Sequence, residues 1–280
     1  MVRLMALDLD GTLLNDQKQV PESARHALQY AEKQGVTVAF CSGRNHADAL
    51  YIAQQVGIPV WSITTNGAYL GHSGAEDALQ LQPLPEEKAA RIIAISHRFH
   101  GVPCVYTPLV EYNEAGYEEI VDYAAKQGNP VLYNPTKKEH LVHDAKEWEE
   151  ILPHVAGQIM KCIVFLPNPD EFPGFEAALH EEGGLTVTTS IMFGGLVVSV
   201  EINREGVTKG GTLHRLQEHL GISPEETLIF GDSGNDLSMI SCGKFLAMQN
   251  AQPEVQAQAW EITGDNNTDG VASAVYRLIK

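Results

Sequence analysis

Largely apolar runs alternate with helical patterns along the first part of the chain. Residues 4–7 and 36–40 have the short, buried character of parallel strands, and 63–65 form a third such strand. The first two are separated by apolar residues at helical spacing, namely Ala24, Ala27, Leu28 and Ala31. The order strand, helix, strand, helix, strand predicts an α/β fold with a doubly wound parallel sheet and right-handed crossovers.

This rhythm breaks after Asn66-Gly67, a hairpin-type turn signal, and Pro83-Leu84-Pro85 has the composition of a stiff linker. The following segments mix strand and helix patterns as a small α+β unit does, with an irregular stretch over 102–161. The α/β rhythm returns with a strand at 196–202. We therefore expect a Rossmann-like core of residues 1–83 and 189–280, interrupted by an inserted α+β domain of residues 84–188.

Two acidic loops follow apolar strands at opposite ends of the chain. Asp8-Leu9-Asp10-Gly11-Thr12 comes after residues 4–7, and Gly231-Asp232-Ser233-Gly234-Asn235-Asp236 comes after residues 227–230. In an open α/β sheet, ligands bind at the carboxyl ends of the strands. The two loops are therefore expected to share one cavity, as a divalent-metal phosphoryl-transfer site requires.

The first loop has the residues for covalent catalysis. On an extended backbone Asp8 and Asp10 project to the same side, and Gly11 permits the chain to turn. One carboxylate can attack phosphorus while the other protonates the leaving oxygen and later activates water. We expect the Thr12 hydroxyl to hold the second carboxyl. The alternative is a turn rich in cap-forming residues with no chemistry.

The second loop has the residues for a metal site. Asp232 and Asp236 offer the hard oxygen ligands that Mg²⁺ favours, and Asn235 can orient a neighbouring carboxylate. The alternative is helix capping by Ser233 or Asn235, with an aspartate in the first turn. The two interpretations are compatible.

Two further segments supply groups that fit a phosphate. Lys209 opens a helix, so that its ammonium can reach back toward the strand ends and balance the aspartates. Ser42 and the amides around Gly43 form a phosphate cradle at a helix N-terminus, with a plain helix cap as the alternative for Ser42. An exposed, merely solvated lysine is the alternative for Lys209.

Composition narrows the class of protein. The 280 residues are 44% hydrophobic, which is enough for a sizeable core, and the formal charge of −17 argues against nucleic acid or an anionic membrane as partner. With no apolar run near the roughly 20 residues that span a bilayer, we expect a soluble, cytoplasmic protein. Its four scattered cysteines are expected to be buried, reduced thiols, with a catalytic thiol at Cys41 as a lesser alternative.

In kind and order these motifs resemble those of the haloacid dehalogenase superfamily of phosphatases and phosphotransferases. The match runs from the Asp8 loop through Ser42 and Lys209 to the Asp232 loop. An insertion between Ser42 and Lys209 is similar to that of the Cof-type branch, which carries an α/β cap. The same branch is indicated by Thr65-Asn66-Gly67-Ala68, Asn250-Ala251 and Asp269-Gly270-Val271-Ala272.

The resemblance implies roles for individual residues. Asp8 would be the nucleophile that becomes an aspartyl-phosphate, and Asp10 the general acid and base. Mg²⁺ would be held by the Asp8 and Asp232 carboxylates and the Asp10 main-chain carbonyl, with Asp236 and Asn235 behind the metal and the lysine. Ser42 and Lys209 would grip the phosphoryl group. Further positions that fit the substrate or phosphate pocket are Asn66, Asn250 and Arg44, while Gln249 departs from the branch, which often has glycine there.

The expected activity is Mg²⁺-dependent hydrolysis of a small phosphate monoester, a sugar phosphate or similar metabolite, by a monomer or small homo-oligomer. A phosphomutase using the same intermediate is one alternative. A non-catalytic switch phosphorylated on Asp8 is another, although Asp10 as a positioned acid and base would shorten the life of the acyl phosphate. The sequence does not name the substrate.

Overall fold

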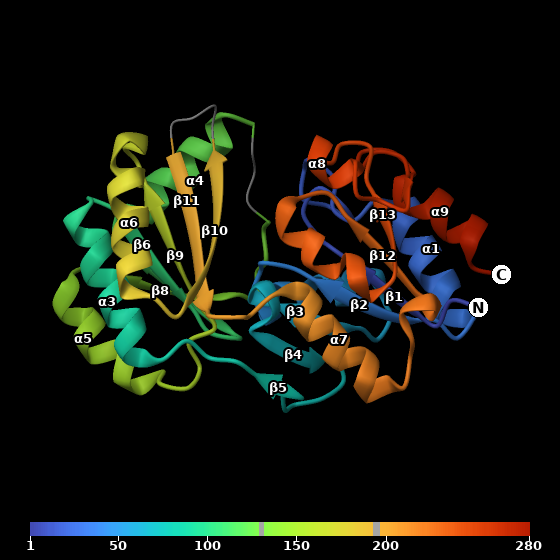
Figure 1. Ribbon diagram of the computed structural model, residues 1–280, viewed down its shortest axis with the longest axis horizontal. Helices are drawn as coiled ribbons and strands as arrows, with labels where there is room; N and C mark the ends of the chain where they lie inside the picture. Colours follow the sequence, from blue (N-terminus) through green and yellow to red (C-terminus); the bar gives the residue numbers. More distant parts are fainter. Residues whose placement is uncertain (129–131, 193–196) are drawn as a thin grey trace. The chain divides into compact units, whose positions relative to one another are not determined.

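A computed structural model describes residues 1–128, 132–192 and 197–280, and the chain divides into two compact units (Figure 1). The core unit consists of Met1–Gln80, Leu132–Pro135 and Thr208–Lys280. The inserted unit consists of Leu81–Val131 and Thr136–Val207.

The core unit is built on an eight-stranded sheet in the order β14-β13-β12-β1-β2-β3-β4-β5. Neighbours from β14 to β3 are parallel, and β4 returns antiparallel to β3 after the turn at Asn66-Gly67. The strands are β1 (Leu4–Leu7), β2 (Thr37–Cys41), β3 (Trp61–Thr64), β4 (Tyr69–His72), β5 (Gln80–Leu81), β12 (Thr227–Gly231), β13 (Lys244–Ala247) and β14 (Glu261–Ile262). The predicted doubly wound parallel sheet is confirmed.

Helices pack on this sheet through apolar faces. The predicted face of α1, made of Ala24, Ala27, Leu28 and Ala31, is fully buried, and α1 lies beside α9 (Figure 1). The core helices are α1 (Glu22–Lys33), α2 (His46–Val56), α7 (Lys209–Leu220), α8 (Pro253–Gln256) and α9 (Gly270–Leu278). The 3₁₀ segments include Thr65–Gly67, Pro224–Glu226 and Gly234–Cys242.

The inserted unit is a six-stranded sheet in the order β10-β11-β9-β6-β7-β8, antiparallel except for the β7–β8 pair. One face packs on α3, α5 and α6, and α4 packs on the other (Figure 1). The strands are β6 (Val102–Tyr106), β7 (Val110–Glu114), β8 (Lys138–Val142), β9 (Lys161–Leu166), β10 (Leu185–Met192) and β11 (Val197–Arg204). The helices are α3 (Glu86–Arg98), α4 (Tyr117–Lys126), α5 (Ala145–His154) and α6 (Phe172–Glu182), with a 3₁₀ segment at Pro169–Glu171.

The boundary between the units lies later in the chain than the sequence suggested. We expected the core to resume at residue 189, but β11 pairs with β9 and β10 inside the inserted unit, and the core resumes at Thr208. A short apolar run is compatible with a parallel core strand and with the central strand of an antiparallel sheet, so the pattern alone does not separate them. Leu196, the expected start of that strand, lies outside the described residues.

The stretch over 102–161 that the sequence left irregular contains regular elements. Beyond β6, it holds β7, α4, β8 and α5, whose apolar positions are few and partly exposed. In the described ranges of both units, no helix is long and apolar enough to cross a membrane.

Candidate active site

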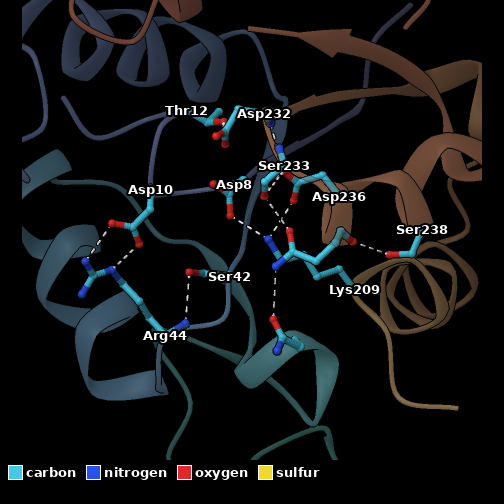
Figure 2. Close-up of polar contacts among 12 residues, drawn as sticks. Asp8, Asp10, Thr12, Ser42, Arg44, Lys209, Asp232, Ser233, Asp236 and Ser238 are labelled. Carbon is cyan, nitrogen blue, oxygen red and sulfur yellow. Dashed lines mark hydrogen bonds and ion pairs between the residues drawn. The ribbon is translucent and has the colours of Figure 1, made fainter. Parts of the chain in front are cut away.

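The two acidic loops meet because their strands are neighbours. β1 and β12 pair in parallel, with Leu7 opposite Phe230, so the loops leave the same sheet edge. The Asp8 amide donates to the Phe230 carbonyl at 3.0 Å. Ligand oxygens of Asp8, Asp232 and Asp236 all lie within 4.8 Å of one another. The structure therefore brings together the carboxylates that the sequence separates by more than 200 positions (Figure 2).

Gly11 makes this close approach possible. Its φ is +79°, in the left-handed region, and a Cβ there would lie 2.5 Å from Oδ2 of Asp232. The next residue, Thr12, donates its hydroxyl to Asp232 Oδ1 at 3.0 Å. The prediction that Thr12 holds Asp10 is therefore wrong: past the turn at Gly11, Thr12 lies against the second loop while Asp10 lies against Arg44 (Figure 2).

Lys209 is the cation at the centre of the acidic cluster. It is buried, and its ammonium donates to Asp8 Oδ1 and to Asp236 Oδ1, both at 2.7 Å. Thr208 caps α7 by accepting from the Gly211 amide at 3.0 Å, which fixes the start of the helix directly before Lys209. The lysine thus reaches back from a helix start to the strand ends, as its sequence position predicted.

Asp236 is engaged on both carboxylate oxygens. Oδ1 accepts from Lys209, and Oδ2 accepts from the amides of Asp232 and Ser233 at 3.0 and 3.1 Å. Ser233 caps the 3₁₀ segment Gly234–Cys242, so the predicted capping is real and coexists with the acidic cluster. Among the described residues, no donor is bonded to Oδ2 of Asp8 or of Asp232. These two oxygens are the ones available to a ligand.

The charges in this cluster do not balance within the protein. Burial raises the pKa of Asp8 well above its usual range. The positive charge of Lys209 lowers this pKa in part, and the negative charges of Asp236 and Asp232 raise it further. Burial and the charge of Asp236 raise the pKa of Asp232 to about 7. Three carboxylates face one ammonium, and a divalent cation with hard oxygen ligands is the group that would offset the excess. The donor set therefore fits a metal ion of this kind.

Asp10 has a separate set of partners. Arg44 donates from Nε to Oδ2 at 2.6 Å and from Nη2 to Oδ1 at 2.8 Å, and Lys18 donates to Oδ1 at 2.8 Å. Although burial acts in the opposite direction, these two cations hold the pKa of Asp10 well below its usual range. Arg44 also donates from Nη1 to Asp48 at 3.1 Å.

The turn between β2 and α2 differs from the expected cap. Ser42 is buried and its hydroxyl accepts from the Arg44 amide at 3.1 Å, with Gly43 between them. Asn45 caps α2, because its side chain accepts from the Asp48 amide at 3.0 Å. The alternative of Ser42 as a plain helix cap is therefore wrong, since the helix begins later at His46.

Asn66 and Asn250, both predicted near the substrate, occupy different places. Asn66 is buried with a positive φ of 60°, and accepts a long hydrogen bond of 3.5 Å from Asn235. A positive φ is uncommon for a non-glycine residue, although asparagine adopts it more readily than most, and such conformations concentrate at functional sites. Asn250 instead donates to the Gly11 carbonyl at 2.8 Å and so supports the first loop from outside.

Sequence reasoning missed Lys18 and Asp48. Lys18 lies in a polar loop that gave no chemical signal, and its positive φ of 57° is visible only in the structure. Asp48 lies in the first turn of α2, where an acidic residue is ordinary. Its burial beside Arg44 marks it as part of the site.

The structure disfavours the alternative of a catalytic cysteine. All four, Cys41, Cys104, Cys162 and Cys242, are free and buried, as predicted. Burial raises the pKa of Cys41 far above its usual range, which disfavours the thiolate that a nucleophile requires.

Comparison with known proteins gives a consistent result. A family model described as haloacid dehalogenase-like hydrolase matches residues 5–275. A pyridoxal phosphate phosphatase of Escherichia coli is 30% identical, covering 98% of this chain and 97% of its own. An HMP-PP phosphatase of Cronobacter sakazakii is 29% identical, covering 92% and 88%. A solved haloacid dehalogenase-like hydrolase from Bacteroides thetaiotaomicron superposes with a TM-score of 0.83 at 25% identity, covering 99% of this chain and 100% of that one.

Proposed function

Because the chain belongs to the haloacid dehalogenase-like hydrolases and is a phosphatase of small phosphate substrates, we propose that it works with Mg²⁺ through an aspartyl-phosphate on Asp8. The observation that carries this proposal is the buried Lys209 bridge between Asp8 and Asp236, set beside Asp232. Lys209 holds the Asp8 carboxylate in place at the end of β1 through one oxygen, which leaves the other oxygen for attack on phosphorus.

In the proposed first step, a carboxylate oxygen of Asp8 attacks phosphorus and the bond to the leaving oxygen breaks. Lys209 is placed to balance the negative charge of the phosphoryl group, together with Ser42 and Gly43 at the neighbouring turn and Asn66 beyond it. In the second step water attacks the acyl phosphate, which releases inorganic phosphate and regenerates Asp8. Asn235 and Asn250 support this arrangement from the second loop and from behind Gly11.

Asp10 is the proposed general acid and base. It would donate a proton to the leaving oxygen in the first step and take one from water in the second. Without substrate its carboxylate is the anion, held on both oxygens by the Arg44 fork and by Lys18. To act as the acid it would have to take up a proton as one of these cations turns to the substrate. An anionic substrate entering this pocket would compete with Asp10 for the same two cations.

The proposed Mg²⁺ ligands are the Asp8 and Asp232 carboxylates and the Asp10 main-chain carbonyl, with Asp236 fixing the loop that carries Asp232. When bound, the ion would act as a Lewis acid that offsets the charge of the phosphoryl oxygens. Thr12 orients the Asp232 carboxylate through its hydroxyl.

The proposed substrate is the phosphate monoester of a small metabolite. A sugar phosphate is the first class to test, and pyridoxal phosphate is a second class suggested by the Escherichia coli relative. Both carry a compact, anionic phosphate, which suits a site with Lys209 beside Asp8 and with Arg44 and Lys18 beside Asp10.

The test is phosphate release from a panel of phosphorylated metabolites, with Mg²⁺ and with excess chelator, using Asp8→Asn as the blank. We expect release from a few related compounds, its loss on chelation, and a fall of at least about a thousandfold in Asp8→Asn. An isomeric phosphate in place of free phosphate would identify a mutase instead. Full activity with chelator would contradict the metal, and full activity of Asp8→Asn would contradict the nucleophile.

A further inference from the structure

Four residues from the middle of the insertion belong to the core unit. Leu132–Pro135, here called the docked segment, groups with the core, whereas the chain on either side groups with the inserted unit. Leu132 is buried in the same apolar cluster as the strands of the core sheet. Asn134 is 8% exposed, while Tyr133 between them is 79% exposed. Leu132 and Asn134 are therefore the two side chains through which the segment is buried.

Asn134 is bonded to α2 close to its start. Its Nδ2 donates to Asp48 Oδ1 at 2.9 Å and to the Ala47 carbonyl at 3.3 Å. Asp48 is buried at 3% exposure, and its other oxygen accepts from Arg44. A buried carboxylate depends on all of its donors, because an unsatisfied lone pair there has no water to bind.

From Asp48 the contacts continue to the reacting groups. The Arg44 guanidinium is planar, so the bond from Nη1 to Asp48 also sets the plane from which Nε and Nη2 bind Asp10. The order of contacts is Asn134, Asp48, Arg44, Asp10. The contact of Asn134 with Asp48 is a hydrogen bond, and the two contacts of Arg44, with Asp48 and with Asp10, are ion pairs. In each contact a nitrogen donates to a carboxylate oxygen.

We propose that Asn134 is a positioning residue for the phosphatase reaction: it orients Asp48, Asp48 orients Arg44, and Arg44 aims Asp10 at the leaving oxygen. This inference rests on the proposed role of Asp10 as general acid. Under this proposal Asn134, which lies within the sequence insertion, contributes to the chemical step. Docking of Leu132–Pro135 on the core then completes the catalytic group.

Leaving-group dependence separates this role from a merely structural one. An alkyl phosphate leaves as a basic alkoxide and needs a proton, whereas 2,4-dinitrophenyl phosphate leaves as a stable anion and does not. The ratio kcat/KM reports phosphoryl transfer to Asp8 and excludes the later hydrolysis step. A misdirected Asp10 should therefore lower kcat/KM for the alkyl substrate only.

The experiment measures kcat/KM for both substrates in full-length wild type and variants, with the alkyl substrate taken from the active members of the panel. Asp10→Asn calibrates the effect, with an expected loss of about a hundredfold or more for the alkyl substrate. For Asn134→Ala we expect a loss of about tenfold, mainly in kcat, since misplaced groups slow chemistry more than binding. With 2,4-dinitrophenyl phosphate both variants should stay within about threefold of wild type.

The matched control is Asn168→Ala, which also removes one asparagine hydrogen bond, to the Asp170 amide, from an exposed turn of the inserted unit. It should leave both substrates unchanged. Asp48→Asn changes the residue that Asn134 contacts while keeping its shape, and it should show the same selective loss for the alkyl substrate. This second variant tests the inference if Asn134→Ala folds poorly. Circular dichroism melting checks the fold of each variant.

The outcomes are distinguishable. A selective loss in Asp10→Asn, Asn134→Ala and Asp48→Asn supports the inference. A selective loss in Asp10→Asn alone overturns the positioning role of Asn134 and leaves the proposed function intact. An equal loss of kcat/KM for both substrates in Asn134→Ala has the same meaning. No selectivity in Asp10→Asn overturns the general acid of the proposed function.

Discussion

The neighbours of Asp8 determine how easily its carboxyl group ionises. One oxygen is held by Lys209, but Asp8 is buried and two further carboxylates lie within 4.8 Å, so its ionised form, which attacks phosphorus, is electrostatically costly without a metal ion. Burial and the charge of Asp236 likewise raise the pKa of Asp232 to about 7. A metal ion is thus expected to stabilise the fold as well as the reaction.

This crowding predicts how stability depends on pH and metal. The pKa of Asp232 is higher in the folded than in the unfolded chain, so its ionisation opposes folding. Its contribution to the free energy of unfolding therefore falls as pH rises from about 4 to about 7. Mg²⁺ binds the ionised carboxylates and so should raise the melting temperature more at about pH 8 than at about pH 5.

Calorimetry with and without Mg²⁺ at the two pH values checks this, with Asp232→Asn as control. The variant should lose most of the Mg²⁺-dependent shift. An equal shift at both pH values, or an undiminished shift in Asp232→Asn, would mean that the ion binds elsewhere.

The sequence predicted which candidate residues come together but not all of their contacts. Asp8, Asp232, Asp236 and Lys209 came together as expected, because strand ends and helix starts place them. The partner of Thr12 was missed, since the turn at Gly11 decides on which side of the loop it lies. Local pattern carries no information on that choice.

At the scale of elements, α7 and the 3₁₀ segment Gly234–Cys242 form one rigid support. Gly210 lets them touch: a Cβ at this position would lie 1.8 Å from the Ser238 carbonyl oxygen, and the Gly210 amide donates to Ser238 Oγ at 3.1 Å. Lys209 and Asp236 stand on these two elements. Their ion pair therefore depends on this close packing.

Gly210→Ala should force α7 away from Ser238. We expect a loss of about 2–3 kcal/mol in the free energy of unfolding, as for other overpacked contacts, together with lower kcat through displacement of Lys209. Urea unfolding and phosphate release measure the two effects.

Gly211→Ala is the matched control, because Gly211 is exposed and its Cβ would meet only Thr208 Oγ1 at 3.2 Å. Here alanine should be neutral or stabilising by up to about 1 kcal/mol. Because helix propensity favours alanine at both positions, equal destabilisation by both changes would contradict the contact with Ser238 as the cause.

At the scale of the whole molecule, the parallel sheet was predictable and the inserted unit was predictable only in outline. Core strands such as β1 and β12 are buried along their whole length, so their apolar runs are clear. β8 has four exposed residues of five, and α4 has one buried residue, so neither gave a pattern. Docking of Leu132–Pro135 on the core depends on contacts between distant segments, which no local pattern encodes.

The central claim is that the phosphoryl group passes through Asp8, and trapping tests it most directly. In Asp10→Asn, 2,4-dinitrophenyl phosphate should still phosphorylate Asp8, while hydrolysis is slowed by about a hundredfold or more for want of a base. Mass spectrometry of the acid-quenched variant should then locate the phosphate on Asp8, with none in the Asp8→Asn, Asp10→Asn double variant. Phosphate on another residue, or in the double variant, would contradict the account.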